Sequence, residues 1–511
     1  MIHSRTTIVL LGAAVFVGAI LRGWQVGESL WLDELHTSWT VSDSLAEVAE
    51  RAAIGNQSPL YFWLAWFFAR LPITPEVALR LPSLLAGCAL PAALYWLATL
   101  FPSGEKDDSP DPAPALLAAW LVAIDPKAIF YTQEARPYAL LILAAVLHLG
   151  LLILAMRRTT FWPRPLWVVT GALLVHLNYT GGLILLAEFF ALGLLGILAS
   201  RKTELALRNE VFDFLLTNWL DLVALIILLL PAIPGVLAVA ERRENWTQFV
   251  KPKPWEELFR LFPWTLAIVP IVVLYSWRAV VAKRQLVLLV SWLVVPLFVA
   301  WLLTQLGVAA LFHQRYVIAV LPASLLAAAL SVRLGTNPAT QSALIGIVLA
   351  VSVYQGGLVR NWRQDGRLLH DRNENWRAAV NVLNEQLAND HSPVLVGSGL
   401  IEADDLPRNS SPLFREYCVC PVRCMYRLQT ERVHPLTFND PGKLIPELRD
   451  KLKNEQSIWL IARSPRKREQ LLVDLQQSIG RNENFRTEPV ENFGQVYLQK
   501  IHLHKPSLPA E

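Results

Sequence analysis

The sequence has few charged residues, and this shortage excludes two classes of protein. Only 17% of its 511 residues are charged, whereas charged residues make up about a quarter of an ordinary soluble domain. The basic residues are scattered along the chain, and the net charge is only +4. An ordinary soluble protein is therefore excluded. Nucleic acid is not expected as a partner, because nucleic-acid-binding chains concentrate their basic residues in a patch or stripe.

Cysteines are also few, and their spacing does not favour a metal site. Cys88 lies in an apolar segment, whereas Cys418, Cys420 and Cys424 cluster near the C-terminus. The cluster has neither the histidine nor the Cys-x-x-Cys spacing of a typical zinc site, so a local disulfide or free thiols explain it better. The C-terminal part also has no phosphate-loop or Gly-x-Gly-x-x-Gly signature. No metal and no cofactor are expected.

Long apolar segments, by contrast, dominate the chain. Hydrophobic residues make up 54% of it, its mean hydropathy is +0.37, and its apolar blocks of roughly 17–22 residues match the length that spans a hydrocarbon core. Nineteen tryptophans fit the aromatic belts of membrane interfaces. We expect a polytopic α-helical membrane protein with about 11 transmembrane helices. The predicted spans are 7–22, 79–101, 115–131, 138–156, 166–178, 181–200, 216–237, 262–277, 285–306, 315–332 and 341–358.

The region between the first two spans, residues 23–78, is mixed in character. Its aromatic stretch from Tyr61 to Phe68 is too short to cross a membrane, which takes about 20 residues. We therefore predict one outer loop with short interfacial helices. Basic residues of later short loops, such as Arg157 and Arg164, then mark the cytoplasmic side by the positive-inside rule. This topology places the 23–78 loop and the C-terminus outside.

The composition changes sharply after Val359, where charged residues become frequent and long apolar runs end. Helix-like and strand-like stretches alternate there, a pattern typical of a small α/β domain. They are helices at 376–387 and 443–454 and strands at 393–397, 457–461 and 495–498. We predict a transmembrane domain at 1–358 and a soluble α/β domain at 359–511. The favoured role of the second is docking or lid formation without chemistry.

Candidate site residues lie at the outer ends of the predicted spans. Asp33 and Glu34 follow the first span, and ionised side chains at a membrane boundary are costly unless they serve a function. The others are Gln133, Glu134, Arg136 and Tyr138 between spans three and four, His176 between spans five and six, and His313, Arg315 and Tyr316 at the start of span ten. We expect one outward-facing pocket. It suits a sugar that carries a phosphate, because arginine binds phosphate through a fixed fork of donors.

Each of these residues also has a purely structural interpretation. Glu134 and Arg136 can stabilise a tight turn, and a lone histidine such as His176 is more often hydrogen-bonded in the interior than catalytic. Arg315 can extend to the interface simply to keep its charge in water. Asp33 and Glu34 together can form an ordinary helix N-terminus. These alternatives stay open on the sequence alone.

Five motifs occur in an order that resembles a known family. They are Trp31-x-Asp33-Glu34, Ser58 to Trp63, Leu79 to Ser83, Gln133 to Tyr138, and Arg315-Tyr316. Over residues 1–340 the chain resembles the bacterial relatives of the dolichyl-phosphate-mannose protein mannosyltransferases and the aminoarabinose transferases of lipid A, which form glycosyltransferase family 39 and have a GT-C fold. The resemblance implies a polyprenyl-phosphate-linked sugar as donor and inverting transfer on the periplasmic face. It also implies Asp33 as the base and Glu34 as a neighbour that positions donor or acceptor.

One segment departs from the mannosyltransferases. They carry a His-Pro-Pro-Leu-Gly-Lys-like segment, whereas this chain has Gln57 to Phe62 and lacks the basic residue there. A contact with the lipid phosphate from this segment is therefore not expected. The acceptor also stays open as a lipid, a glycan or a protein.

The sequence thus predicts an inverting glycosyltransferase of the bacterial inner membrane. A phosphate monoester with a second pKa of about 6 leaves readily, so a cation from Arg136 or Arg315 suffices for the leaving group and Asp33 takes the proton of the acceptor hydroxyl. One alternative is a transporter or flippase for lipid-linked sugars, but the paired halves with broken helices that this class shows are not found. The other is a membrane-anchored protein that binds the cell envelope.

Overall fold

The chain is divided into two compact units in the computed structural model. The described residues are 5–102, 112–157, 161–198, 218–243, 250–258, 261, 283–335, 337–367, 372–409, 411–439, 448, 451–452, 455–463, 469, 472–473 and 485–503. Unit 1 comprises Met1–Val26, Ser58–Tyr61 and Arg80–His370, and unit 2 comprises Gly27–Gln57, Phe62–Leu79 and Asp371–Glu511. Most of the outer loop therefore groups with the C-terminal part, which differs from a single domain boundary after residue 358.

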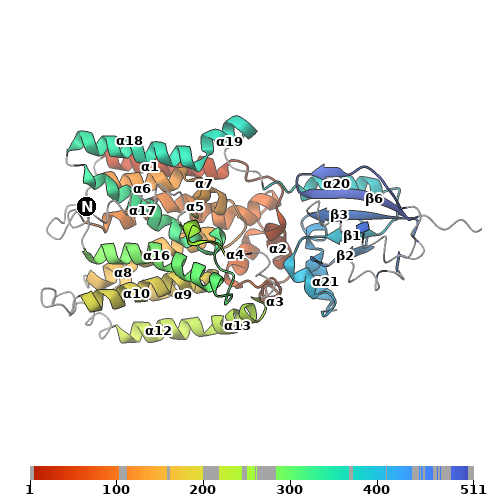
Figure 1. The fold of residues 1–511 in the computed structure, drawn as a ribbon, viewed down its shortest axis with the longest axis horizontal. Coiled ribbons are helices and arrows are strands. Elements are labelled where there is room, and N and C mark those ends of the chain that lie inside the picture. The colour runs from red at the N-terminus through yellow and green to blue at the C-terminus, as the bar shows by residue number, and fades with distance from the viewer. Residues whose placement is uncertain are drawn as a thin grey trace, which may run out of the picture. The chain divides into compact units, whose positions relative to one another are not determined.

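Unit 1 consists of helices. They are α1 (Arg5–Gly23), α5 (Pro75–Thr99, of which the first five residues belong to unit 2), α6 (Pro112–Ile124), α7 (Pro126–Thr132), α8 (Tyr138–Arg157), α9 (Pro163–Leu177), α10 (Gly182–Leu198), α12 (Trp219–Leu229), α13 (Ile233–Glu241), α16 (Lys283–Gln305), α17 (Leu321–Leu330), α18 (Pro338–Gly356) and α19 (Leu358–Asp365). The longer helices run side by side (Figure 1), with α1 and α17 packed on α6, α9 on α8, and α16 on α10. Unit 1 is thus a helical bundle.

The predicted spans match these helices to different degrees. Seven described helices are long and apolar enough to cross a membrane, and up to eight if one bent pair counts as a single span. Two predicted spans correspond to helices that are short for a membrane crossing. The span predicted at 166–178 is α9, which has 15 residues, and the span predicted at 315–332 is the short apolar helix Ile318–Leu334. The span predicted at 262–277 lies outside the described residues. Helix α4 (Leu60–Phe68) has nine residues, which confirms that this aromatic stretch is too short to cross.

The bent pair replaces the straight span predicted at 115–131. Helices α6 and α7 meet at an angle of 58°. The bend lies at Asp125, whose carboxylate caps α7 by accepting the Ala128 N–H at 2.8 Å, and at the proline that follows it. The guanidinium of Arg22, fully buried in α1, donates to the carbonyls of Val122 and Ala123 at 2.9 and 3.0 Å. These bonds satisfy carbonyls at the end of α6, which has no further turn to accept them.

A buried polar network joins three helices of the bundle. His148 Nε2 of α8 lies 2.5 Å from a Glu188 carboxylate oxygen of α10, and the indole N–H of Trp167 in α9 donates to the other Glu188 oxygen at 2.9 Å. All three side chains are buried. Because polar groups in an apolar bundle must find partners within it, this network fixes how α8, α9 and α10 pack.

Unit 2 contains the predicted α/β fold. Its strands are β1 (Val394–Gly397), β2 (Val433–Pro435), β3 (Ser457–Arg463), β4 (Phe485–Thr487), β5 (Glu491–Phe493) and β6 (Val496–Leu503). The sheet order is β2-β1-β3-β6-β4, and β5 also pairs with β6. Strands β2, β1 and β3 are parallel, whereas β6 runs antiparallel to β3, β4 and β5. Helix α20 (Trp376–Leu387) packs against β6 (Figure 1). The helix predicted at 443–454 lies mostly outside the described residues.

Part of the outer loop is built into the core of this unit. Its helices are α2 (Leu32–Thr40) and α3 (Val48–Ile54), and α21 (Pro412–Cys418) comes from the C-terminal part. Leu32 and Trp39 of α2 share one hydrophobic cluster with Leu395 of β1 and Leu460 of β3. Trp39 is fully buried, and burying an aromatic side chain of this kind contributes roughly 2–3 kcal/mol. The α/β fold therefore holds the helix that carries Asp33 and Glu34.

Candidate active site

Asp33 and Glu34 occupy the first turn of α2. Glu34 is fully buried, and one of its carboxylate oxygens accepts the N–H of Trp31 at 3.4 Å. Asp33, by contrast, is only half-buried. Negative charge is favourable in the first turn because the unpaired N–H groups of a helix point there. Glu34 thus closes the start of the helix, and Asp33 is the carboxylate that solvent reaches.

The backbone just before Asp33 is fixed by side chains at three successive residues. The N–H of Leu30 donates to the Tyr426 hydroxyl at 2.8 Å, and that of Leu32 donates to Glu374 Oε2 at 3.1 Å. With the Trp31–Glu34 bond, the N–H groups of residues 30, 31 and 32 all have side-chain acceptors. Two of the acceptors come from the C-terminal part. The Tyr426 hydroxyl in turn donates to Glu76 at 3.1 Å.

Glu374 is the central acceptor of this arrangement. Its Oε1 lies 2.7 Å from Arg463 Nε. Its Oε2 accepts two hydrogen bonds, one from the indole N–H of Trp376 at 3.0 Å and one from the backbone N–H of Leu32. Burial raises the pKa of Glu374, an effect that Arg463 and these hydrogen bonds oppose and that nearby Asp33 reinforces. The carboxylate therefore links β3, α20 and α2 at a point within electrostatic range of Asp33.

Glu402 is a second buried carboxylate near Asp33. It accepts a hydrogen bond from Asn56 at 3.4 Å and another from Tyr417. Burial raises its pKa, and the charge of Asp33 raises it further. We call Asp33, Glu34, Glu374 and Glu402 the acidic cluster. Asp33 is its most exposed member, and the buried members are engaged in hydrogen bonds.

A second group of predicted site residues lies in unit 1. Tyr131, at the end of α7, is within electrostatic range of Glu134, Tyr138 and Arg315. The Tyr131 and Tyr138 rings meet edge to face, with centroids 5.3 Å apart. We call these four residues the Arg315 cluster. The bundle therefore brings residues of the motif at 133–138 and Arg315 of the motif at 313–316 within electrostatic range of the same tyrosine.

Gln133 has the contacts of a helix cap. Its side-chain amide donates to the carbonyls of Leu21, Arg22 and Trp24 at 3.3, 2.9 and 2.6 Å. These carbonyls lie at the C-terminal end of α1, where no further helical N–H is available. The contacts of Gln133 thus give it a structural role at that helix end.

Arg136 is buried in the same turn, between Glu134 and the start of α8, with 4% of its surface exposed. Its backbone carbonyl accepts the Ser83 hydroxyl at 2.9 Å, and Ser83 is bonded to the Tyr61 hydroxyl at 3.2 Å. Two other segments of unit 1 therefore hold the backbone carbonyl of Arg136, that of Ser83 directly and that of Tyr61 through Ser83.

The predicted histidines are held by backbone contacts. His176 Nε2 lies 2.7 Å from the Leu228 carbonyl of α12, in keeping with the structural interpretation. His313 caps a short 3-10 helix, η5 (Gln314–Tyr316), because its Nδ1 accepts the Arg315 N–H at 3.4 Å. Its ring centroid lies 5.8 Å from that of Tyr316, and the Arg315 guanidinium lies 5.3 Å from the same Tyr316 ring. Tyr316 thus contacts both neighbours in the motif.

The acidic cluster belongs to unit 2 and the Arg315 cluster to unit 1. The single pocket predicted for Asp33, Arg136 and Arg315 therefore stays a prediction. Glu374, Glu402 and Tyr426 were not identified from the sequence, because no local motif marks a side chain whose partner lies hundreds of residues away. Arg22 and Asp125 did carry a signal, since both are charged residues next to or within apolar segments.

Neither metal ligation nor a disulfide is seen in the described part of the chain. No group of three or more His, Cys, Asp or Glu side chains is arranged there to hold a metal ion. Cys88, Cys418, Cys420 and Cys424 are free thiols. Burial raises the pKa of Cys418 and Cys420 well above the ordinary value and that of Cys424 to about 12. The sequence left a local disulfide or free thiols open for the C-terminal cysteines, and the structure has free thiols.

Comparison with known proteins identifies the fold. No family model matches the sequence, and no curated protein matches it. The chain is similar to the apo oligosaccharyltransferase of Archaeoglobus fulgidus, with 12% identity and a TM-score of 0.53 over 89% of this chain and 69% of that one. It is also similar to ArnT from Cupriavidus metallidurans bound to undecaprenyl phosphate, with 12% identity and a TM-score of 0.51 over 96% of this chain and 97% of that one. The protein is thus a polytopic helical membrane protein with a GT-C fold, as the sequence predicted.

Proposed function

We propose that this protein is an inverting glycosyltransferase that moves a sugar from a polyprenyl-phosphate-linked donor to a hydroxyl acceptor on the periplasmic face of the bacterial inner membrane. The observation that carries the proposal is the fixed position of Asp33. Three successive N–H groups before it bind side-chain oxygens, and its own carboxylate stays half-exposed. A general base needs this combination, because it must be held in place and yet reach a substrate.

Asp33 acts as the base in this mechanism. Its carboxylate takes the proton of the acceptor hydroxyl while the hydroxyl oxygen forms a bond to the anomeric carbon of the sugar. Such proton transfer contributes about 10²–10⁴-fold to the rate. The buried carboxylates of Glu374 and Glu402 lie within electrostatic range of Asp33.

The arginines stabilise the leaving group. The bond between the anomeric carbon and the phosphate oxygen breaks as the new bond forms, and its electron pair remains on the polyprenyl phosphate. Because the second pKa of a phosphate monoester is about 6, this group leaves as an anion without needing a proton. Arg136 and Arg315 supply positive charge and a fork of N–H donors for it. Attack from the face opposite the leaving group inverts the anomeric centre.

The structural neighbours support a lipid-phosphate donor. ArnT of Cupriavidus metallidurans was solved with undecaprenyl phosphate. The oligosaccharyltransferase AglB of Archaeoglobus fulgidus was solved with an inhibitory peptide and a dolichol-phosphate, and it aligns with a TM-score of 0.52 at 12% identity over 89% of this chain and 69% of that one. Glycosyl transfer from such a lipid needs only Asp33 and the arginines in this scheme, without a metal.

The test is transfer in cells that lack the gene. Envelope glycans and lipids of the deletion strain, analysed by mass spectrometry, are expected to lack one sugar that the wild-type gene restores. The Asp33→Asn variant should be inserted at normal abundance and fail to restore it. Glu385→Gln makes the same change on an exposed part of α20 and should restore it fully. Restoration by Asp33→Asn would reject Asp33 as the base, and identical glycans with and without the gene would reject the transferase.

A further inference from the structure

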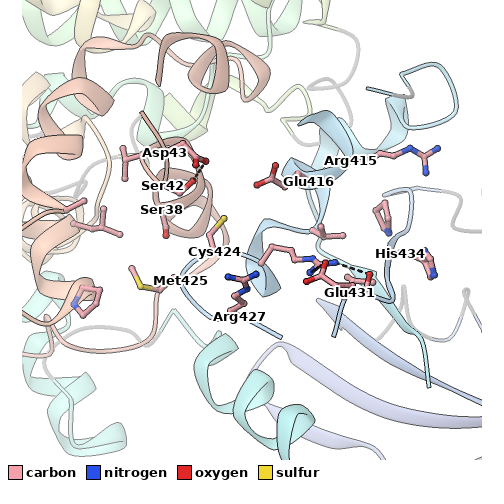
Figure 2. Close-up of a pocket in the computed structure, with 18 of the residues that line it drawn as sticks. Ser38, Ser42, Asp43, Arg415, Glu416, Cys424, Met425, Arg427, Glu431 and His434 are labelled. Atoms are coloured by element: carbon pink, nitrogen blue, oxygen red, sulfur yellow. Dashed lines mark hydrogen bonds and ion pairs between the residues drawn. The ribbon is translucent and has the colours of Figure 1, made fainter. Parts of the chain in front are cut away.

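A large cavity lies in unit 2 and is lined by the C-terminal end of α2, the segment that follows it and the C-terminal part (Figure 2). Its volume is about 1060 Å³, at the upper end of the range in which small molecules bind, roughly 300–1000 Å³. Its walls come from the last turn of α2, the segment between α4 and α5, α21 and β2. At 1.5 Å per residue, Asp33 and the lining residue Ser38 are roughly 8 Å apart along α2. The cavity and the proposed base are thus joined by one short helix.

The lining of the cavity is positively charged. Five basic residues line it, against three acidic ones, Asp43, Glu416 and Glu431. The basic residues are Arg70, Arg415, Arg423, Arg427 and Lys451. Glu431 lies 2.8 Å from Arg423, and both Asp43 and Glu416 pair with Arg51, which does not line the cavity. Because basic residues outnumber acidic ones in the lining, the cavity favours an anionic ligand.

The pKa of His434 reflects the positive charge around it. Burial lowers this pKa to about 4, and the nearby charges of Lys451, Arg432, Arg415 and Arg423 contribute to the lowering. The imidazole is therefore neutral at pH 7, and it adds hydrogen-bonding capacity to the cavity without adding charge. These cations repel one another, and a bound anion would be attracted to each of them.

The opposite wall has a different chemistry. Figure 2 shows Ser38 of α2 grouped with Ser42 and Asp43 of the segment that follows it, and Arg415 and His434 on the side formed by the C-terminal part. Hydroxyl and carboxylate oxygens can accept hydrogen bonds from the hydroxyls of a sugar. Guanidinium groups, in contrast, bind phosphate oxygens in a bidentate way. The cavity thus combines a wall for hydroxyls with a wall for an anion.

We propose that this cavity binds a phosphate-bearing saccharide, held by its phosphate on the basic residues of the lining and by its hydroxyls along the end of α2. The source of the group is either a soluble sugar phosphate or the headgroup of a glycolipid, since both present the same chemistry. Binding itself does not depend on the proposed transferase. The further assignment of this saccharide to the acceptor, with Asp33 on the same helix, rests on the proposed function.

Binding to the full chain in lipid nanodiscs tests the proposal. Mannose 6-phosphate is titrated by calorimetry, with mannose and inorganic phosphate as matched controls. We expect saturable binding of mannose 6-phosphate that weakens as salt rises and is at least tenfold tighter than that of either control. The lipid source is tested with nanodiscs that contain phosphatidylinositol 4-phosphate. In these nanodiscs we measure how far the lipid competes with the binding of mannose 6-phosphate. Tighter binding from the lipid identifies a headgroup as the source, and tighter binding of the soluble compound identifies a free saccharide.

Variants locate the site. Arg415→Ala and Arg427→Ala should each weaken binding about tenfold, the cost of losing one charge-assisted hydrogen bond. The matched control Arg408→Ala, an exposed arginine of the same unit outside the cavity, should leave binding unchanged. Arg427 is exposed, so its removal should not affect folding. No saturable binding from either source, or equal losses in Arg408→Ala, would overturn the proposal. Asp33→Asn should bind normally, which separates failure of this site from failure of the transferase.

Discussion

The two clusters are built in different ways. In unit 1, Tyr131, Glu134 and Tyr138 come from one turn and the residues on either side of it, and only Arg315 arrives from a distant segment. In unit 2, the backbone before Asp33 is held by Tyr426 and Glu374, which are 396 and 342 residues from their partners in the sequence. The comparison teaches that the C-terminal part is a component of the Asp33 site. It sets the position of the proposed base, whereas the bundle sets that of the proposed cations.

A large effect that separates the two clusters is expected at Arg315. Arg315→Ala should lower kcat by about 10²–10³, as the loss of one electrostatic contact to a leaving group does. Arg315→Lys should recover little, because an ammonium cannot reproduce the fork of a guanidinium. Turnover of purified protein on a synthetic polyprenyl-phosphate sugar is the measurement, with the exposed Arg363→Ala of α19 as control. Normal turnover of Arg315→Ala would remove this cluster from the mechanism.

A smaller effect is expected at Glu374, which positions α2 without touching substrate in this scheme. Glu374→Gln places an amide opposite Arg463 and disturbs the bond to Leu32, so kcat should fall about tenfold, the equivalent of one charge-assisted hydrogen bond. KM for the donor should not change. The melting temperature is measured alongside, with Glu385→Gln as control. Unchanged kcat in a folded Glu374→Gln protein would show that the C-terminal part does not set the position of the base.

Gln133 offers a change of stability with little change of activity. Its amide donates to three carbonyls at the end of α1, and leaving buried groups unpaired costs about 1–3 kcal/mol. Gln133→Ala should therefore lower the unfolding temperature in detergent while kcat/KM stays within about twofold. The opposite pattern, weaker donor binding with unchanged stability, would restore the substrate-binding role predicted from the sequence.

The smallest effect is a pH dependence confined to unit 2. Burial alone would raise the pKa of Asp390, but hydrogen bonds from Ser392, Lys500 and Trp459 lower it from 3.8 to about 2. A lowered carboxyl pKa stabilises the folded state above the ordinary value, and this contribution is lost as the pH falls from 3.8 to about 2. Asp390→Asn should make acid unfolding less steep in this range, followed by tryptophan fluorescence. An unchanged acid transition would contradict the assignment.

The sequence predicted elements that depend on long or alternating patterns. The strands predicted at 393–397, 457–461 and 495–498 are β1, β3 and β6. They could be predicted because each contains enough apolar residues to form a recognisable pattern in the sequence. Strands β2, β4 and β5 have three residues each and were missed.

The candidate site was predictable only where it is local. The turn at 133–138 and its arginine carry a recognisable pattern of residues, so the sequence pointed to them. The acceptors that hold Asp33 do not, because Glu374 and Tyr426 occur in segments without any motif and acquire their role only when unit 2 folds. The hydrophobic cluster that joins α2 to β1 and β3 is likewise formed by long-range contacts.

The most direct test of the account separates turnover from donor binding at Asp33. Purified Asp33→Asn protein is compared with wild type in two assays, the single-turnover rate of sugar transfer and the affinity for the polyprenyl-phosphate sugar. The account predicts a rate lowered by about 10²–10⁴ with an affinity that stays the same, since the phosphate contacts are assigned to the arginines. A normal transfer rate in this variant would contradict the account.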